Sequence, residues 1–426
     1  AVVGLTWIAA GVVGALPYLF SGVLRSPVDA FFESASGFTT TGSTILPGDA
    51  IDALPRSIAF GRSFTHWLGG IGIVMVFVVL FPTGGRSLFR SEVPGIAREA
   101  SRQRVRDSAL ALVKIYVGLT ALQVVLLLAA GLDAFDAVVH AFGTLATGGF
   151  SSHSTSVAHF ASWVVEAIVI VFMFAAGLNF AIYDTALRVG PRRAWKVAVG
   201  STEVRWYAGM IAVSSVSIAL ALWFWGGSNG RGPAHLPDYS SFLLALRDST
   251  FSVVSLQTST GYGTADFDQW PEFCRALLML LAIVGACAGS TGGGLKMVRF
   301  LIVGRAALRG LRQFARPRAI NVVRMDDETL DEGVVASVTG YFGLWVLFLM
   351  VGTLALCLMG VELVTSSTAV LATLNNIGPG LAQVGPYLNF AEMPALGKLL
   401  LSFLMIAGRL EFYAVVILLL PGFWRR

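Results

Sequence analysis

Charged residues are scarce in this chain, and their scarcity excludes an ordinary soluble domain. Of its 426 residues only 13% are Asp, Glu, Lys or Arg, whereas 55% are hydrophobic. A soluble domain needs about a quarter of its residues charged to cover its surface. Lipid is the other solvent that can cover so apolar an exterior. The composition therefore predicts an integral membrane protein surrounded by membrane lipids.

Cysteines and clustered catalytic groups are also few. Cys274, Cys287 and Cys357 show no metal-ligand spacing, and at least two of them lie in apolar stretches as small buried hydrophobes. The apolar stretches hold no Ser/His pair, Asp dyad or metal-ligand cluster with convincing spacing. The net charge of +5 comes from basic residues dispersed along the chain. An enzyme, an organic cofactor and a nucleic-acid partner are therefore not expected.

Apolar stretches recur along the chain in two lengths. A membrane-spanning helix needs about 20 mostly apolar residues, and four shorter stretches lie between alternate pairs of runs that long. Short segments at membrane depth are tolerated as re-entrant half-helices where protein or a water-filled cavity surrounds them. The sequence therefore predicts an all-α membrane protein. The long runs are 1–20, 61–82, 109–131, 160–187, 205–226, 273–308, 333–361 and 394–421, and the short ones are 28–38, 133–146, 241–258 and 365–376.

Basic residues concentrate in every second connection between the long runs. Arginines and lysines cluster in 85–107, 188–205 and 305–324, and the chain ends in Arg425 and Arg426. Cytoplasmic loops of membrane proteins carry such an excess of Lys and Arg. We therefore expect the basic loops and both termini to be cytoplasmic, in a plasma membrane.

The four short stretches end alike, each passing from an apolar half-helix into small or hydroxylic residues and then a glycine. The endings read S-A-S-G-F-T-T-T-G-S-T (34–44), H-A-F-G-T-L-A-T-G-G-F-S (140–151), V-S-L-Q-T-S-T-G-Y-G-T-A-D (254–266) and L-A-T-L-N-N-I-G-P-G (371–380). Aligned on Gly42, Gly148, Gly261 and Gly378, they lie 106, 113 and 117 residues apart. Near-regular spacing indicates an internal array. With two spans per unit the repeats are parallel, so four units can surround one axis.

The half-helices carry start signals. Ser26 before Pro27 forms a cap and first turn, and Asp133, Ser240 and Thr365 can cap the other three. The chain enters each half-helix from the outside, so its partly negative C-terminal end points to the membrane centre. Four such ends around one axis favour a cation there.

The glycine strands fit a selectivity filter. Rings of backbone carbonyls can replace the hydration shell of K⁺, and glycine adopts the backbone angles this needs at little cost. The third strand, T-S-T-G-Y-G, is close to the T-V-G-Y-G filter of K⁺ channels. We expect the carbonyls of 39–42, 145–148, 258–261 and 375–378 to bind the ion. The residues assigned to K⁺ are Thr40, Thr41, Gly42, Ala146, Thr147, Gly148, Ser259, Thr260, Gly261, Asn376, Ile377 and Gly378.

Six motifs together resemble one known family over essentially the whole chain. They are F-F-E-S-A-S-G-F-T-T-T-G-S-T (31–44), T-G-G-F-S (147–151), S-T-G-Y-G-T-A-D (259–266), G-S-T-G-G-G-L-K (289–296), L-N-N-I-G-P-G-L (374–381) and G-R-L-E (408–411). The chain thereby resembles the Trk/Ktr/HKT superfamily of K⁺ transporters, in its TrkH branch.

The resemblance implies K⁺ uptake through a pseudo-fourfold pore, a homodimer with one pore per subunit, and a cytosolic nucleotide-binding regulatory ring similar to TrkA. In the plant branch a serine at the first filter glycine accompanies Na⁺ selectivity, and here that position is Gly42. Members of the TrkH type usually carry two further helices before the first repeat, so we expect sequence ahead of residue 1.

The sixth apolar run is interrupted by G-A-C-A-G-S-T-G-G-G-L-K (285–296), of which six of twelve residues are glycine or serine. Such a segment is a poor helix and predicts a flexible intramembrane loop. A nucleotide phosphate loop needs Lys directly after Gly and before Ser or Thr, whereas Lys296 lies between Leu295 and Met297. Two interpretations of the segment remain: a glycine patch that allows close helix packing, or a gate beneath the filter. The family resemblance favours the gate, which we assign to Gly292, Gly293, Gly294, Lys296 and Arg409.

Several ionisable residues stand in or near apolar segments. Such residues face a cavity or a partner because charge is costly in lipid, and the family resemblance places Arg409 against the 285–296 loop. Lys296 could do the same or extend to the cytoplasmic face. His66 and His140 could sense protons or simply pack. Asp266 and Asp268 could concentrate cations at the mouth or be solvated.

The prediction is a gated K⁺ pore, with selectivity softened because its four strands differ. A symporter coupling K⁺ to H⁺ or Na⁺ is the alternative, although the inverted repeats common in those folds are absent from this sequence pattern. A poorly selective Na⁺/K⁺ pathway is the third reading. The pore repeats are expected at 1–84, 108–187, 205–310 and 333–426, and the cytoplasmic loops at 85–107, 188–204 and 311–332.

Overall fold

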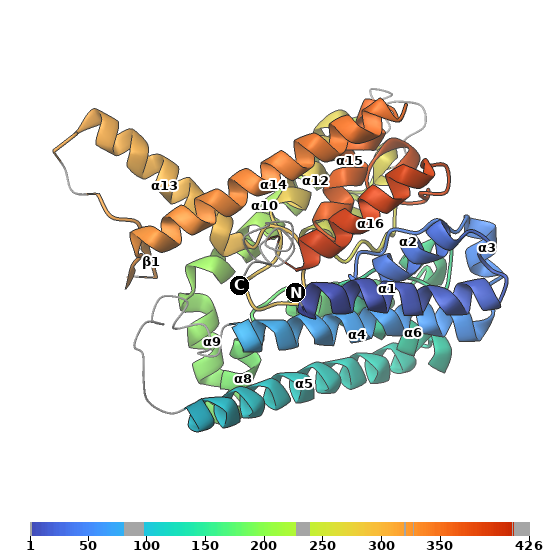
Figure 1. Cartoon of the computed structure of the whole chain (residues 1–426), viewed down its shortest axis with the longest axis horizontal. Helices are drawn as coiled ribbons and strands as arrows, with labels where there is room; N and C mark the ends of the chain where they lie inside the picture. The colour runs from blue at the N-terminus through green and yellow to red at the C-terminus, as the bar shows by residue number, and fades with distance from the viewer. Residues whose placement is uncertain are drawn as a thin grey trace, which may run out of the picture.

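The chain folds into a bundle of helices, several of them strongly tilted to one another (Figure 1). The computed structural model describes residues 2–80, 98–226, 239–318, 321–326, 328–410 and 412. The part of the basic loop up to residue 97, and the C-terminal residues from 413 on, lie outside these ranges. The described α-helices are α1 (Val2–Phe20), α2 (Pro27–Phe38), α3 (Gly48–Asp52), α4 (Arg56–Leu80), α5 (Arg98–Ala129), α6 (Ala134–Leu145), α7 (Trp163–Ala176), α8 (Phe180–Val189), α9 (Pro191–Gly200), α10 (Thr202–Gly226), α11 (Phe242–Gln257), α12 (Glu272–Ile283), α13 (Met297–Ala315), α14 (Glu332–Leu358), α15 (Leu363–Leu374) and α16 (Ala395–Arg409).

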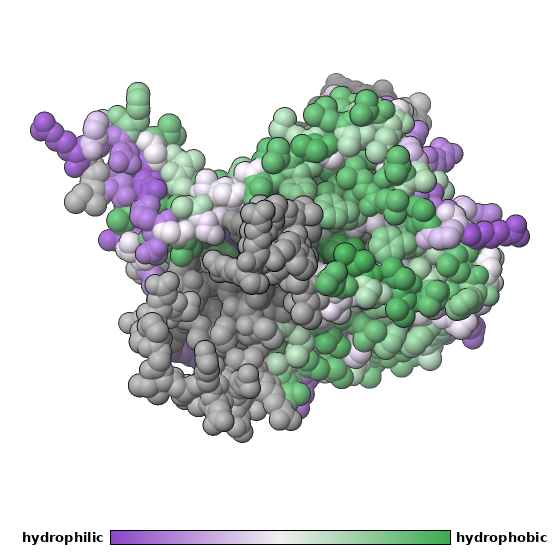
Figure 2. Space-filling model, in the orientation of Figure 1, coloured by the Kyte–Doolittle hydropathy of each residue, from purple (hydrophilic) through white to green (hydrophobic). Residues whose placement is uncertain are grey.

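The outer face of the bundle is apolar, as a lipid-facing surface must be. Leucine, valine and isoleucine side chains point outward, for example Val125 on α5, Val213 on α10 and Leu354 on α14, each at least 60% exposed. On the face that Figure 2 shows, apolar residues cover most of the described bundle, and hydrophilic ones gather on the projecting α13 and at the opposite end, on the right. The membrane class predicted from composition fits this surface.

Three of the described helices are long and apolar enough to span a membrane unaided. They cover Ala109–Ala129, Thr202–Trp225 and Glu332–Leu358. The bent pair α7 and α8 could make a fourth span. Two of the eight predicted spans, 160–187 and 273–308, are not single uninterrupted helices in the described residues. The run at 273–308 breaks between α12 and α13, as its glycines predicted.

The break in the fourth predicted span, 160–187, was missed by the sequence analysis. The chain turns by 90° between α7 and α8. Asn179 caps α8 by accepting a hydrogen bond from the amide of Ala181. The carbonyls freed at the end of α7 are not left bare, because Gly177 accepts from the amide of Cys287 and Ala176 from that of Thr291. The 285–296 loop, more than 100 residues further along the chain, therefore stabilises the bend.

Four half-helices, α2, α6, α11 and α15, stand where the short apolar stretches predicted them. Ser26 and Asp133 cap α2 and α6 through their side chains as expected. Two predicted caps are wrong. Ser241, rather than Ser240, precedes α11, and α15 begins at Leu363 because the carboxylate of Glu362 accepts from the amides of Val364 and Thr365.

The contacts between helices close into a ring. Each half-helix packs on the first helix of its own repeat: α2 on α1, α6 on α5, α11 on α10 and α15 on α14. Each also packs on the second helix of the preceding repeat: α6 on α4, α11 on α7, α15 on α12 and α2 on α16. The last pair joins the fourth repeat to the first. Four parallel repeats thus surround one axis, as the spacing of the glycines predicted.

A small hairpin lies beyond α13 and was not predicted. Strands β1 (Arg324–Met325) and β2 (Glu328–Thr329) pair antiparallel, with Arg324 opposite Thr329. In Figure 1, α13 and β1 project from the bundle on the same side. The arginine-rich sequence of α13 explains its position outside the apolar bundle, because guanidinium groups are costly to bury.

Candidate functional site

The four glycine strands share one backbone conformation. In each strand the residue after the helix cap adopts a left-handed angle, and so does the glycine two positions later. The first set is Thr40 (φ 52), Thr147 (φ 53), Ser259 (φ 59) and Asn376 (φ 53). The second set is Gly42 (φ 83), Gly149 (φ 81), Gly261 (φ 80) and Gly378 (φ 104). Because the same two positive-φ positions recur in all four strands, we attribute them to the shared fold of the repeats.

Non-glycine residues at positive φ mark stored strain. Thr40 and Thr147 are β-branched, and such residues rarely take this conformation. Each such residue costs on the order of 1–3 kcal/mol, and residues of this kind cluster where function over-determines the backbone. These four, of the nine non-glycine residues with positive φ in the described part of the chain, lie on the strands that the sequence predicts to form a filter.

The strands are held to the half-helices that precede them by matching hydrogen bonds. The amide before each strand glycine donates to a carbonyl five residues earlier in the half-helix, at 2.8–2.9 Å. The pairs are Thr41 to Ser36, Gly148 to Gly143, Thr260 to Ser255 and Ile377 to Ala372. These bonds use the carbonyls at the helix ends and fix where each strand begins.

The structural register corrects the sequence alignment of the second repeat by one residue. By cap position, left-handed angle and hydrogen bonding, Gly149 is equivalent to Gly42, Gly261 and Gly378, and Gly148 is equivalent to Thr41. Ala146, expected as the first of three ligands, takes the helix-cap position of Thr39. The equivalent strand is therefore 146–149, not 145–148. Two adjacent glycines had made the choice ambiguous, and only backbone angles separate them.

Each of these glycines lies directly against the next repeat. A Cβ built on Gly42 would lie 2.1 Å from the carbonyl oxygen of Gly148, and one on Gly149 would lie 2.0 Å from that of Thr260. The corresponding distances are 2.1 Å from Gly261 to Ile377 and 2.9 Å from Gly378 to Thr41. These close contacts run from each repeat to the next, and the fourth repeat contacts the first. It leaves no room for a side chain, so glycine is required at all four positions.

A cavity open to solvent lies over the glycine end of the strands. All four register glycines line it, together with Ser43, Tyr387 and other residues of the connections that follow the strands. The opposite end of the strands, at the helix caps, contacts the 285–296 loop. The strands thus stand between an outer cavity and an inner loop.

A buried ion pair braces the first strand, and the sequence analysis did not identify it. Glu33 and Arg62 are both fully buried, with Arg62 Nε donating to Glu33 Oε1 at 2.7 Å. Glu33 also accepts from Thr44 Oγ1 and the amide of Ile45. Arg62 Nη1 donates to the carbonyl of Ser151 at 3.1 Å, so the pair ties the first repeat to the second.

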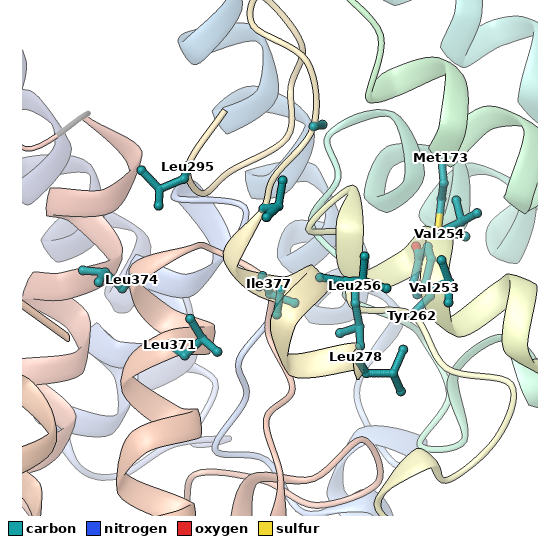
Figure 3. Close-up of a cluster of buried hydrophobic side chains, with 14 of the residues drawn as sticks. Met173, Val253, Val254, Leu256, Tyr262, Leu278, Leu295, Leu371, Leu374 and Ile377 are labelled. Carbon is teal, nitrogen blue, oxygen red and sulfur yellow. The ribbon is translucent and has the colours of Figure 1, made fainter. Parts of the chain in front are cut away.

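Apolar packing braces the fourth strand. Ile377 of the fourth strand belongs to the same buried cluster as Leu256, Leu278 and Leu374, which come from α11, α12 and α15. Figure 3 shows Ile377 beside Leu256 at the centre of this cluster. Asn375 adds polar contacts, accepting from Trp345 Nε1 and donating to the carbonyl of Ala282 at 2.8 and 2.7 Å.

The 285–296 loop lies against the inner ends of the strands. The amide of Gly293 donates to Ser259 Oγ at 2.5 Å. A Cβ built on Gly293 would lie 2.3 Å from the carbonyl oxygen of Asn375, and one on Gly292 would lie 3.0 Å from that of Thr258. The glycines therefore let the loop backbone approach the strand carbonyls closely. The loop therefore packs directly against the third and fourth strands.

Two buried cations hold this loop, as the sequence analysis considered. Arg409 Nη1 donates to the carbonyl of Thr291 at 2.8 Å, the loop contact that the resemblance implied. Lys296 does not extend to the surface: it is 4% exposed, and its Nζ donates to the carbonyl of Gly292 and to Ser290 Oγ. Arg409 is 2% exposed, and its Nε and Nη2 have no hydrogen-bond partner among the described residues.

The remaining candidates of the sequence analysis have structural partners. His66 Nδ1 lies 2.7 Å from the carbonyl of Gly37, and its ring stacks on Phe150. His140 contacts the carbonyl of Asp136 and Ser151 Oγ. Both are packed, buried histidines.

Asp266 and Asp268 follow the third strand and are engaged with protein. Asp268 pairs with Arg275 and accepts from the amide of Ala382. Burial, together with the neighbouring carboxylate of Asp268, raises the pKa of Asp266 above its usual range. Asp268 thereby links the connection after the third strand to the connection after the fourth.

The family model described as "TrkH: Cation transport protein" matches residues 1–422. This chain belongs to the TrkH family. It is 38% identical to the Trk system potassium uptake protein TrkH of Escherichia coli strain K12 over 432 residues, covering 100% of this chain and 85% of that protein. It is 32% identical to the Trk system potassium uptake protein TrkG of the same strain, with 84% of TrkG covered.

A solved structure agrees with the fold. The crystal structure of the potassium transporter TrkH from Vibrio parahaemolyticus superposes with a TM-score of 0.87 at 34% identity, covering 99% of this chain and 84% of that one. The fold is therefore the helical membrane fold of TrkH, and the family is one of transport proteins, not of enzymes.

Proposed function

We propose that this chain takes up K⁺ through the axis enclosed by its four glycine strands. The supporting observation is the closed series of contacts from Gly42 through Gly149, Gly261 and Gly378 back to the first strand. It gathers four equivalent strands, each with backbone carbonyls, around one line through the bundle. The relatives above are named as potassium uptake proteins.

The proposed ligands are the backbone carbonyls of 39–42, 146–149, 258–261 and 375–378. Carbonyl rings suit K⁺ because they replace its hydration shell without a net charge. The four strands differ in sequence: T-T-T-G, A-T-G-G, T-S-T-G and N-N-I-G. Because the ring is not fourfold symmetric in chemistry, we expect softer selectivity against Na⁺ than a symmetric filter gives.

We propose that the 285–296 loop is the gate. Gly292, Gly293 and Gly294 give it the backbone freedom to move, while Lys296 and Arg409 hold it beneath the strands by bonds to loop carbonyls. The contacts of Gly292 and Gly293 with the strands support a blocking role for the loop. Conduction requires that it move aside.

We propose that the protein lies in a plasma membrane, with the basic loops and both termini inside because Lys and Arg concentrate in those segments. We further propose the repeat and loop boundaries given above, a homodimer with one pore per subunit, and a cytosolic nucleotide-binding partner similar to TrkA.

Uptake of ⁸⁶Rb⁺ into proteoliposomes tests the proposal. Excess K⁺ should suppress uptake, and equal Na⁺ should suppress it less. Uptake should persist without a proton gradient. If Na⁺ competes as well as K⁺, K⁺ preference is wrong; if a proton ionophore abolishes uptake while the K⁺ gradient remains, the protein is a symporter.

A further inference from the structure

A buried carboxylate away from the strands accepts hydrogen bonds from the 285–296 loop and from the helix that follows it. Glu203 lies in the first turn of α10 and is 9% exposed. Its Oε1 accepts a hydrogen bond from the amide of Ala288, within the loop, at 2.6 Å. The same oxygen accepts from the amide of Val298, in the first turn of α13, at 3.2 Å. One oxygen thus joins the loop to the helix that follows it.

Hydrogen bonds and a nearby cation stabilise the Glu203 side chain where it lies. A carboxylate near the end of an apolar helix is costly unless it is paired or hydrogen-bonded. Lys296 lies in the chain between the two amides and is close enough to interact electrostatically with Glu203. The Nζ of Lys296 in turn binds the carbonyl of Gly292, so both side chains bind backbone groups of the loop.

The residue before Glu203 contacts the hairpin. The amide of Thr202 donates to Asp326 Oδ1 at 2.8 Å, and Asp326 stands at the turn after β1 with φ 46. The hairpin is anchored on α13, because Arg305 Nη1 donates to the carbonyl of Arg324 and lies 3.2 Å from Met325 Sδ. Two consecutive residues at the start of α10 therefore contact the hairpin and the loop respectively.

We propose that Glu203 is a positioning residue that holds the 285–296 loop in its blocking position, and that the 324–329 hairpin controls this hold through Asp326 and Thr202. The inference rests on the proposed gating role of the loop. A protein partner that displaces the hairpin would remove the cap from Thr202, shift the start of α10 and withdraw the Glu203 carboxylate from the loop. The hairpin lies on the side predicted to be cytoplasmic.

Cys287 allows a direct test, because its buried thiol lies within the loop. Cys274→Ala and Cys357→Ala leave Cys287 as the single cysteine of the chain. In this background we compare Glu203→Ala, Glu203→Gln and Asp326→Ala. The matched control is Glu332→Gln, because Glu332 also lies in the first turn of a first helix but is exposed and pairs with Arg309. The measurements are the rate of Cys287 modification by a small methanethiosulfonate reagent and ⁸⁶Rb⁺ uptake in proteoliposomes.

Glu203→Ala should raise the modification rate about tenfold, the factor expected from the loss of one charge-assisted hydrogen bond. Glu203→Gln keeps an acceptor oxygen and should give a smaller rise, as should Asp326→Ala. Glu332→Gln should match the background. Uptake of ⁸⁶Rb⁺ should rise in the same order, with its preference for K⁺ over Na⁺ unchanged.

Modification at the background rate in both Glu203 variants would overturn the assignment. If Glu203→Ala does not fold, Glu203→Gln and Asp326→Ala decide by the same criterion. A faster modification with unchanged uptake would mean that Glu203 holds the loop but the loop is not the gate. A lack of uptake by the unmodified protein would reject conduction while leaving the modification result to stand.

Discussion

The glycine strands and the loop beneath them are both rich in small residues, yet they are held in different ways. Each strand is fixed by amide bonds to its own half-helix and by contact with the next repeat, and the first is braced by the buried pair Glu33–Arg62. The loop has backbone bonds from Cys287 and Thr291 to the end of α7, and it is otherwise held by side-chain bonds of Glu203, Ser259, Lys296 and Arg409. A backbone fixed by its own helix ends is rigid. A backbone held by side chains can be released when one of them moves.

The largest effect should come from breaking the ring at Gly149. Gly149→Ala places a Cβ about where the Thr260 carbonyl oxygen lies and also strains a φ of +81, so ⁸⁶Rb⁺ uptake should be lost. Gly131→Ala is the control, because Gly131 also has a positive φ of +98 but open space around it. Gly148→Ala should do less than Gly149→Ala, since its Cβ meets the ring of His66 rather than a strand carbonyl and its φ is not positive. A larger loss of uptake in Gly148→Ala than in Gly149→Ala would instead support Gly148 as the equivalent of Gly42.

The next effect should come from breaking the brace of the first strand. Glu33→Gln leaves the buried Arg62 without its counter-charge, and loss of one partner of a buried ion pair costs about 3–5 kcal/mol. Thermal unfolding in detergent should show this as a lower midpoint. The exposed pair Arg188–Asp184 gives the control, because Asp184→Asn should change the midpoint little. An unchanged midpoint in Glu33→Gln would show that the strand does not depend on this pair.

A change in the loop should alter rate and leave ion preference intact. Arg409→Ala removes the bond to the Thr291 carbonyl, so we expect ⁸⁶Rb⁺ uptake to rise with K⁺ and Na⁺ competing in the same ratio as before. Competition curves measure the ratio directly. An altered K⁺/Na⁺ ratio with normal gating would place Arg409 in the filter instead.

The smallest effect should come from Ser259→Ala, at the contact between the two regions. The change removes the acceptor of the Gly293 amide and leaves a buried donor unpaired, at a cost of about 1–3 kcal/mol to the blocking position. Uptake should rise, by less than in Arg409→Ala, because a water molecule can replace a hydroxyl more easily than a guanidinium. Lower uptake with altered competition would show that Ser259 serves the filter more than the loop.

Sequence patterns predicted the parts of the site that depend on residue type. Apolar length predicted the half-helices, and the glycines of 285–296 predicted the break between α12 and α13. The pattern did not predict the bend at Gly177, because the bend is stabilised by amides of Cys287 and Thr291 from another repeat. Glu33, Arg62 and Glu203 were missed for a similar reason: their partners lie far away in the chain, and nothing local distinguishes them from solvated charges.

The sequence alone determined a membrane protein of four parallel repeats with a glycine strand in each, because low charge, apolar length and glycine spacing are local properties of the chain. Only the tertiary structure decided which of Gly148 and Gly149 stands in the ring. Both residues can take a left-handed angle, and the choice follows from the closeness of the Thr260 carbonyl in the next repeat. The same holds for the loop: its composition predicted flexibility, but the contacts with Ser259, Glu203 and Arg409 decided where it rests.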